Sequence, residues 1–125
     1  MYYQIFKYSN AKKQVYNGHR YDSGFEANHA RELDLRLKAK EIKSWEAHKR
    51  LPLIVNNCHI GDYEIDFVVY HHDGTTEYIE TKGRVDRTWA LKWKILEAMN
   101  HNDPNVTMTL VKQRPFQLRN IRKLS

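Results

Sequence analysis

Two strand-like segments, residues 63–70 and 77–82, limit the possible fold of this chain more than any other feature of its sequence. Both are rich in Ile, Val, Phe, Tyr and Thr, the residue types that are enriched in strands. The His-His-Asp-Gly-Thr run between them, residues 71–75, has the composition of a tight turn. The two segments are therefore predicted to pair as an antiparallel hairpin.

The length of this turn decides which side chains face each other across the hairpin. A loop of three residues, 72–74, with Gly74 in a left-handed third position, sets Asp66 opposite Glu80. A loop of two residues sets Asp66 opposite Thr81 instead. We favour the three-residue loop because it places the half-polar faces of the two strands on the same side of the hairpin.

The residues from 23 to about 40 have the clearest helical pattern in the chain. Ser23 and Glu26 form an S-x-x-E capping box, and an apolar stripe follows at helical spacing. The stripe consists of Ala30, Leu33 and Leu37. Glu26 lies at the head of this stripe, so its carboxylate is expected to need a partner, although the capping box alone also accounts for an acid at this position.

The remaining periodic segments add further strands and a second helix. Residues 42–49 and 53–55 are predicted to be extended and separated by Pro52, residues 87–100 to be helical, and residues 105–112 to form another strand. The apolar side of the second helix is predicted to consist of Leu91, Ile95 and Ala98. Helices and strands are thus interspersed, which predicts a chain of the α/β (mixed α+β) class.

The length of 125 residues suits one domain with a modest core, and the sequence contains neither an internal repeat nor a linker rich in Pro, Gly or Ser. Residues 1–125 are therefore predicted to form a single domain. The only cysteine, Cys58, excludes an internal disulfide, and the first residues lack a long apolar run. We expect a soluble cytoplasmic protein with no membrane partner and no small-molecule cofactor.

The net charge of +6 is concentrated at the two ends of the sequence. Residues 1–21 and 112–125 contain nine basic residues and no acidic one, whereas residues 22–111 contain twelve basic and fifteen acidic residues. The chain is thus predicted to be an acidic body with basic N-terminal and C-terminal arms, a layout that suits a polyanionic partner. Solubilising termini would give the same pattern, so charge alone does not identify a nucleic-acid-binding protein.

Four residues stand out once the faces of the strands are assigned: Glu26, Asp66, Glu80 and Lys82. The face opposite Asp66 is predicted to consist of Ile65, Phe67 and Val69. Two carboxylates about 5 Å apart repel each other unless a cation lies between them, so Asp66 and Glu80 predict a Mg²⁺ or Mn²⁺ site. Lys82 projects to the same side as Glu80 and can offset charge on a phosphoryl group, although an ordinary surface lysine would fit the same position.

A zinc site is the weaker interpretation of the metal-ligating residue types. Its conceivable ligands are Cys58, His59, His71 and His72. These residues lie in predicted turns and lack the paired spacing of zinc ligands, so we expect them to be solvated loop residues.

Three stretches together resemble the PD-(D/E)XK nuclease superfamily. They are Asp-Ser-Gly-Phe-Glu at residues 22–26, Tyr-Glu-Ile-Asp-Phe at residues 63–67 and Tyr-Ile-Glu-Thr-Lys-Gly at residues 78–83, a pattern similar to that of phage four-way-junction-resolving endonucleases. A second and closer resemblance, over residues 7 to about 98, is to small phage-encoded nuclease-like proteins. It rests on Lys-Tyr-Ser-Asn-Ala-Lys-Lys at residues 7–13, the Gly before Tyr-Asp-Ser, and the Lys-x-Lys of the second helix.

The resemblance implies a restriction-endonuclease-like core, in which a central mixed β-sheet is flanked by helices, and Mg²⁺- or Mn²⁺-dependent hydrolysis of phosphodiester bonds. It implies that Glu26 binds or orients the metal and that Asp66 and Glu80 ligate it. Thr81 would contribute its backbone carbonyl, and Lys82 would assist the attacking water. One departure is Ile65, which stands where the superfamily name has proline.

Basic residues around this motif are expected to hold the phosphates that flank the cleaved bond. The predicted nucleic-acid-binding residues are Lys12, Lys13, Arg20, Arg84, Arg87, Lys92, Lys94 and Arg114. Trp89 and Trp93 fit either base stacking or packing, and we favour packing for both.

These observations predict a Mg²⁺-dependent endodeoxyribonuclease. It is expected to be selective for DNA structure, such as branched DNA or a Holliday junction, because the chain is too short to carry a separate sequence-reading module. Paired cuts at a junction would require a homodimer, and a phage origin would place the protein in the cytoplasm of a host cell. Two alternatives remain: a non-cleaving nucleic-acid-binding accessory protein of phage replication or packaging, and an RNA-processing nuclease.

Overall fold

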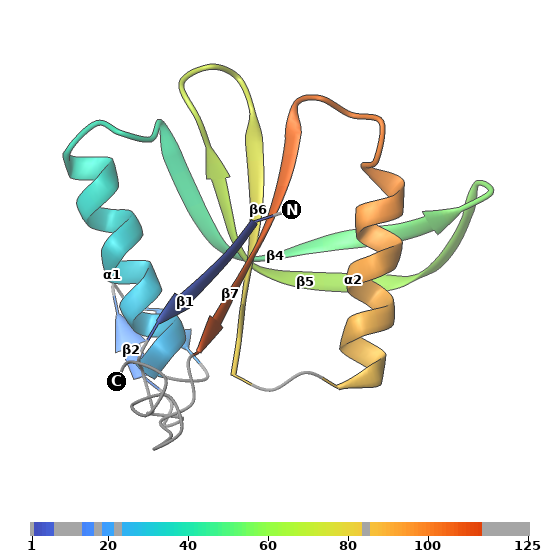
Figure 1. Ribbon diagram of the computed structural model, residues 1–125, viewed down its shortest axis with the longest axis horizontal. Coiled ribbons are helices and arrows are strands. Elements are labelled where there is room, and N and C mark those ends of the chain that lie inside the picture. The colour runs from blue at the N-terminus through green and yellow to red at the C-terminus, as the bar shows by residue number, and fades with distance from the viewer. Residues whose placement is uncertain (1, 7–13, 17–18, 22–23, 84–85, 114–125) are drawn as a thin grey trace, which may run out of the picture.

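The computed structural model describes residues 2–6, 14–16, 19–21, 24–83 and 86–113 (Figure 1). The elements follow in the order β1 (Tyr2–Phe6), β2 (Gln14–Tyr16), β3 (His19–Tyr21), α1 (Gly24–Lys38), β4 (Ser44–Val55), β5 (Cys58–Tyr70), β6 (Thr76–Lys82), α2 (Arg87–Met99) and β7 (Val106–Gln113). Five strands form one sheet in the order β1-β7-β6-β5-β4, and β2 pairs with β3 separately. Parts of the predicted basic arms thus lie within strands.

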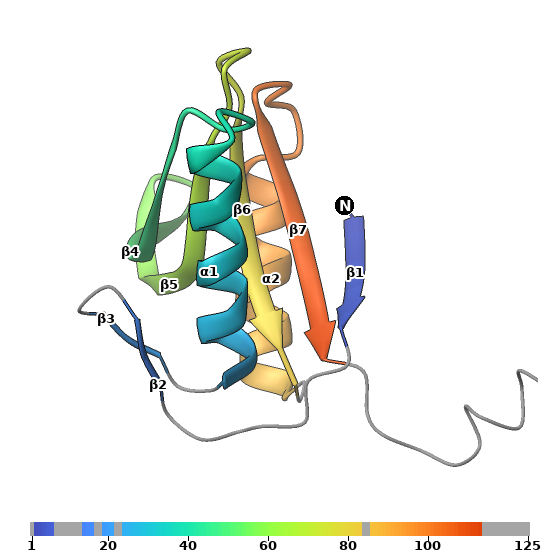
Figure 2. The same ribbon diagram turned by 90° about the vertical axis from the view of Figure 1, so that its left-hand side faces the viewer.

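The sheet is mixed and has a helix on each face. Strand β7 runs parallel to β1 and β6, whereas β5 is antiparallel to both β4 and β6. Helix α1 lies in front of the sheet and α2 behind it in Figure 2, so the two helices cover opposite faces. The predicted class, a mixed α/β chain with a central mixed sheet flanked by helices, is confirmed. Neither helix in the described part of the chain is long and apolar enough to cross a membrane.

Each helix covers its own hydrophobic core. The residues of α1 that enter its core include Phe25, Ala30 and Leu33, which pack against Phe67 and Val69 of β5. The core under α2 is centred on Trp93 and Leu96, which pack against the other face of the sheet at Val68, Met108 and Leu110. Burial of apolar side chains on both faces of the sheet is expected to provide most of the stabilisation of the fold.

The hairpin prediction is confirmed in both pairing and loop length. Val68 of β5 pairs with Tyr78 of β6, in an antiparallel ladder that continues to Tyr70 and Thr76. His71 N–H then donates to the carbonyl of Thr75 at 2.9 Å, which closes a loop of three residues. Gly74, the third residue of this loop, has a φ of 89°, as the predicted left-handed position requires.

The predicted interruption at Pro52 is wrong. Strand β4 continues through Pro52, which pairs with Asp62 of β5. Because β4 is the last strand of the sheet, one of its edges has no neighbouring strand, and a proline without an N–H donor is tolerated there. Residues 44–55 therefore form one long edge strand in place of two short segments.

The predicted apolar side of α2 is right for Ile95 and wrong for its other two residues. Leu91 is 62% exposed and Ala98 is exposed, whereas Ile95 packs against the core in which Trp93 and Leu96 are buried. The helix begins after Asp86, whose carboxylate accepts the Trp89 N–H at 2.8 Å, as an N-cap does. Helical spacing allowed two stripes on this helix, and the larger aromatic side chains occupy the interface with the sheet.

The residues of the long β4–β5 hairpin pack in different cores on the two sides of Asp66. This is contrary to the prediction that Ile65, Phe67 and Val69 form one continuous apolar face. Phe67 packs in the core under α1, but Ile65 packs in the core under α2. The same change occurs in β4 between Ala47, packed against the first core, and Leu51 in the second. Figure 1 shows the two strands bending together towards α2. Asp66 thus lies where the hairpin passes from one core to the other.

Candidate active site

Asp66 and Glu80 face each other across β5 and β6, as the hairpin register predicts. The backbone N–H of Asp66 donates to Glu80 Oε1 at 3.3 Å. Oδ2 of Asp66 accepts two hydrogen bonds from Thr81, from its N–H at 2.8 Å and its hydroxyl at 2.7 Å. Both carboxylates are therefore held in position by groups of the same two strands.

The electrostatic environment of this pair disfavours two negative charges. Burial raises the pKa of Asp66 above its usual range, and the nearby charge of Glu26 raises it further. Burial likewise raises the pKa of Glu80, and the charge of Asp66 adds to this effect. Lys82 opposes both shifts without overcoming them. Binding of a cation would favour the ionised form of both carboxylates.

Glu26 lies in the first turn of α1 and is only 5% exposed. Its Oε1 is 2.7 Å from Nε2 of His48, a residue of β4. This contact provides a partner of the kind that the position of Glu26 on the apolar stripe predicts. Ser23, the other half of the predicted capping box, lies outside the described residues. The effect of Glu26 on the pKa of Asp66 shows that the helix acid and the strand acid share one electrostatic environment.

Lys82 lies between the carboxylate pair and the second helix. Its Nζ is 3.8 Å from Oε2 of Glu80 and 5.1 Å from the centre of the Trp89 ring. Both contacts favour a positive charge at this point, one by direct attraction and the other through the electron-rich ring face. The structure thus brings Asp66, Glu80, Thr81 and Lys82 together, with Glu26 nearby on α1.

A cleft of about 480 Å³ opens at this group, between the middle of β5, the end of β6 and the start of α2. Asp66, Glu80 and Lys82 line it from the sheet, and Trp89 and Lys92 line it from the helix. Glu26 does not line the cleft. The lining of the cleft combines four carboxylates, since Glu64 and Asp86 also contribute to it, with the two amines of Lys82 and Lys92. This composition is suited to a metal ion that an anionic substrate can reach.

Tyr63 and Trp89 form a rigid wall of this cleft. The indole N–H of Trp89 donates to the Tyr63 hydroxyl at 2.6 Å, and the ring of Trp89 stacks on that of Trp93 with centroids 5.8 Å apart. Burial raises the pKa of Tyr63, so its hydroxyl remains protonated. Trp93 is 4% exposed, which confirms the prediction that it packs. Trp89 is partly exposed and combines packing with a place in the cleft wall.

The donor atoms fit Mg²⁺ or Mn²⁺ better than a metal that requires a closed protein cage. Within the described ranges, no three side chains of the His, Cys, Asp and Glu types are grouped so that they could hold one metal ion. Asp66 and Glu80 nevertheless supply carboxylate oxygens, and Mg²⁺ commonly uses only one or two carboxylates together with water and substrate phosphates. The roles of Glu26 and of the Thr81 carbonyl as metal ligands stay predictions.

The predicted zinc ligands do not converge. Cys58 is exposed at the start of β5, and Nε2 of His59 is 2.9 Å from Asp62. His71 is bound to the carboxylate of Glu77 at 2.9 Å, and His72 to the backbone carbonyl of Lys40 at 3.0 Å. The expectation of solvated loop residues is wrong for the solvation of His71, which is half-buried. Cys58 and His59 are exposed as expected, but they lie in a strand and not in a loop.

Only one predicted nucleic-acid-binding side chain among those described lines the cleft. Lys92 does so, and its Nζ donates to the carbonyl of Asp62 at 3.1 Å. Arg87 and Lys94 are exposed on α2 but are not part of the cleft lining. The side chains of the other predicted residues lie outside the described part of the chain: Lys12, Lys13, Arg20, Arg84 and Arg114.

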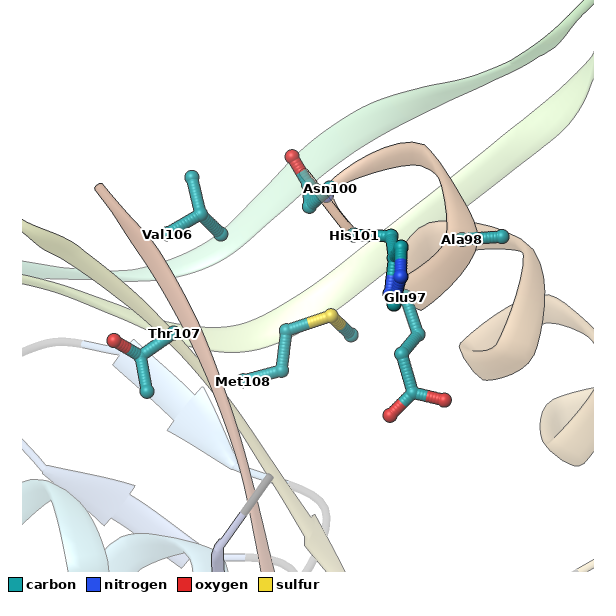
Figure 3. A pocket seen from close by; sticks show the side chains of 7 residues that line it. All are labelled: Glu97, Ala98, Asn100, His101, Val106, Thr107 and Met108. Carbon is teal, nitrogen blue, oxygen red and sulfur yellow. The ribbon is translucent and has the colours of Figure 1, made fainter. Parts of the chain in front are cut away.

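A second and larger cleft, of about 700 Å³, lies near the C-terminal end of α2 (Figure 3). Glu97 and His101 line it from the helix side, and Val106 and Met108 line it from β7. None of the predicted site residues contributes to it. Its single carboxylate and mixed lining do not reproduce the paired acids of the smaller cleft.

Sequence reasoning missed His48, Tyr63 and Trp89 as residues of the site. His48 has no motif around it, and its contact with Glu26 spans 22 positions, so no sequence signal could have found it. Tyr63 lies three residues before Asp66, in a predicted strand that suggested only packing. Trp89 was considered, but its contact with Lys82 depends on how α2 docks on the sheet.

Comparison with known proteins gives a family and no named relative. No curated protein and no solved structure matches the chain. One family model, described as "Protein of unknown function (DUF1064)", matches residues 5–114. This match spans most of the sequence, and so the chain belongs to the DUF1064 family.

Proposed function

We propose that this protein is a Mg²⁺- or Mn²⁺-dependent endodeoxyribonuclease. The observation that carries the proposal is the Asp66–Glu80 pair, which lies in a cleft beside Lys82, with Glu80 buried and Asp66 half-buried. Two adjacent carboxylates with raised pKa values are unfavourable unless they serve a purpose such as binding a cation. The resemblance of the same residues to the PD-(D/E)XK superfamily supports phosphodiester hydrolysis as that purpose.

The residues of the cleft have separable tasks in this reaction. Asp66 and Glu80 would hold the metal ion, and Thr81 fixes Asp66 through its two hydrogen bonds. A bound divalent cation supplies a Lewis acid and lowers the pKa of water. Lys82 stabilises negative charge that grows on the phosphoryl group, because its amine is held beside Glu80. Lys92 and Trp89 line the wall against which the flanking DNA backbone would lie.

Branched DNA is the proposed substrate, and a homodimer the proposed assembly. The described cleft is short and open, and base-specific recognition requires an element that enters a groove. Two copies of the site would be needed to cut two strands of one junction. We infer selectivity for the shape of DNA in preference to its sequence.

The decisive experiment is a cleavage assay on labelled four-way junctions, nicked duplex and linear duplex, with Mg²⁺, Mn²⁺ or chelator. Metal-dependent cutting that favours the junction is expected. Glu80→Gln and Asp66→Asn should each lower the single-turnover rate at least about 100-fold while sparing junction binding, because they remove a proposed metal ligand. Glu97→Gln, in the second cleft, is the matched control and should cleave normally.

Two outcomes would favour the alternatives. Wild-type protein that binds every DNA tested but cuts none would support the non-cleaving accessory protein. Faster cleavage of a matched RNA substrate would support the RNA-processing nuclease. Sedimentation of the protein with and without the junction tests the proposed homodimer directly.

A further inference from the structure

His48 occupies a backbone conformation that is unusual for its place in the fold. It lies in the middle of β4, yet its φ is 56°. Left-handed φ values are strained for residues other than Gly and uncommon within strands, and such strain tends to gather at functional sites. The described pairs of the ladder, Ala47 with Phe67 and Lys49 with Ile65, lie on either side of this residue. The distortion is therefore confined to the point that faces Asp66 in the register.

The side chain of His48 uses this conformation to contact the helix acid. Its Nε2 is 2.7 Å from Oε1 of Glu26, which is a short distance for a nitrogen–oxygen hydrogen bond. The Glu26 side chain is 7% exposed and that of His48 is 29% exposed. A buried carboxylate needs such a partner, and the partner also restricts the direction in which the carboxylate points.

His48 also lies at the junction of the two cores. Ala47 packs against the core under α1, whereas Leu51 is buried in the core under α2. The hairpin bends between these two residues. Asp66 lies in the same region of β5, between Phe67 of the first core and Ile65 of the second. Helix α1, strand β4 and strand β5 thus meet at His48, Glu26 and Asp66.

We propose that His48 is a positioning residue of the metal site, which orients the carboxylate of Glu26 towards the Asp66–Glu80 pair. This inference rests on the proposed metal-dependent activity and adds to it a residue outside the predicted motif. Partners that orient metal-site carboxylates by hydrogen bonding lower metal affinity or activity about 10- to 100-fold when they are removed. The left-handed backbone of His48 is then a cost that the site requires.

The test uses His48→Gly, because glycine keeps the left-handed backbone accessible while the side chain with its imidazole is removed. We expect calorimetry of the full chain to show Mn²⁺ binding weakened about 10- to 100-fold. His59→Gly is the matched control, since His59 also pairs with a carboxylate, that of Asp62, but on the exposed tip of the hairpin. It should leave Mn²⁺ affinity unchanged.

A double-mutant cycle separates positioning from a general structural effect. Glu26→Gln combined with His48→Gly should bind Mn²⁺ no more weakly than Glu26→Gln alone, because His48 acts through Glu26. Added imidazole should partly restore Mg²⁺-dependent cleavage by His48→Gly and leave cleavage by Glu26→Gln unchanged. If His48→Gly does not fold, His48→Asn replaces it, because Asn also tolerates a left-handed backbone.

The possible failures are distinguishable. Wild-type protein that binds and cleaves, with His48→Gly equal to it, overturns the inference and leaves the proposed function intact. Additive losses in the double-mutant cycle also overturn it, since they mean that His48 does not act through Glu26. Wild-type protein that binds neither Mn²⁺ nor Mg²⁺ overturns the proposed function and this inference together.

Discussion

At the scale of single residues, His29 is the clearest case of an ionisable side chain that the fold keeps neutral. It is 5% exposed on α1, and its ring lies 5.3 Å from that of Phe67. Burial lowers the pKa of His29 to about 4, although Glu77 of β6 acts to raise it and Arg36 to lower it. Glu32, one turn further along α1, is 3.7 Å from its Nδ1. Protonation of His29 would place a charge inside the core under α1.

The stability of the protein should therefore fall between pH 6.5 and pH 4. In this range the unfolded chain binds a proton at His29 and the folded chain does not, so acid favours unfolding. The lowered pKa predicts a loss of up to about 3 kcal/mol in the free energy of unfolding as the pH decreases through this window. Urea unfolding of wild-type protein and His29→Leu at several pH values measures this loss. An equal pH dependence in both proteins would contradict the assignment to His29.

At the scale of elements, Gly61 and Gly74 make a matched pair of glycines outside helices. Gly74 in the β5–β6 loop has a φ of 89°, whereas Gly61 in β5 is not in the left-handed region, and an added Cβ would meet nothing within 4 Å at either position. Gly74→Ala should thus destabilise the protein by about 1 kcal/mol through backbone strain alone. Gly61→Ala should be neutral or stabilise it by up to about 1 kcal/mol.

Denaturant unfolding at constant pH measures both changes, and the cleavage assay measures whether the loop still sets the register of Asp66 and Glu80. Gly74→Ala should retain cleavage, because a strained loop of the same length keeps the same facing residues. Deletion of Thr76, with the three-residue loop kept, should abolish cleavage, because it shifts β6 by one position and sets Asp66 opposite Thr81. Normal cleavage by this deletion variant would show that the register of the hairpin does not control the site.

The β5–β6 hairpin also shows what sequence can predict. Its composition and the length of its turn predicted that Asp66 faces Glu80, since the alternation of side chains along a strand and the chemistry of a turn are local properties. The predictions that failed for the other elements failed because of tertiary contacts. Pro52 is tolerated because β4 has a free edge, and α2 turns its tryptophans inward because the sheet offers a matching surface. The left-handed backbone of His48 occurs together with a contact to Glu26 of α1, and a local pattern contains no signal for such a contact.

At the scale of the whole molecule, the acidic site and the basic arms are related by the topology of the sheet. Strands β6 and β7 are parallel, and Lys82 at the end of β6 pairs with Lys112 near the end of β7. Both strands point to the end of the sheet at which α2 begins (Figure 1). Strand β7 thus ends, at Gln113, at the same end of the sheet as the cleft, and the basic residues 114–125 follow it in the sequence. Basic charges near the acids of the site would favour the binding of a polyanion.

This placement predicts that charges in the C-terminal segment contribute to DNA binding and not to the chemical step. Changing both Arg122 and Lys123 to Gln should lower the slope of log K against log salt concentration by up to about 2, since each lost phosphate contact contributes about 0.9. The single-turnover rate at saturating DNA should not change. Binding of a labelled junction at several KCl concentrations measures the slope.

The control removes the same charge from the other end of the sheet. Lys38 and Lys43 are exposed and lie at and just beyond the C-terminal end of α1, which is opposite the cleft end in Figure 1. Changing both to Gln should leave the slope nearly unaltered, because phosphates bound at the cleft lie beyond the range of strong interaction with them at physiological salt. Equal effects of the two pairs would mean that net charge alone, and not the position of the C-terminal segment, drives binding.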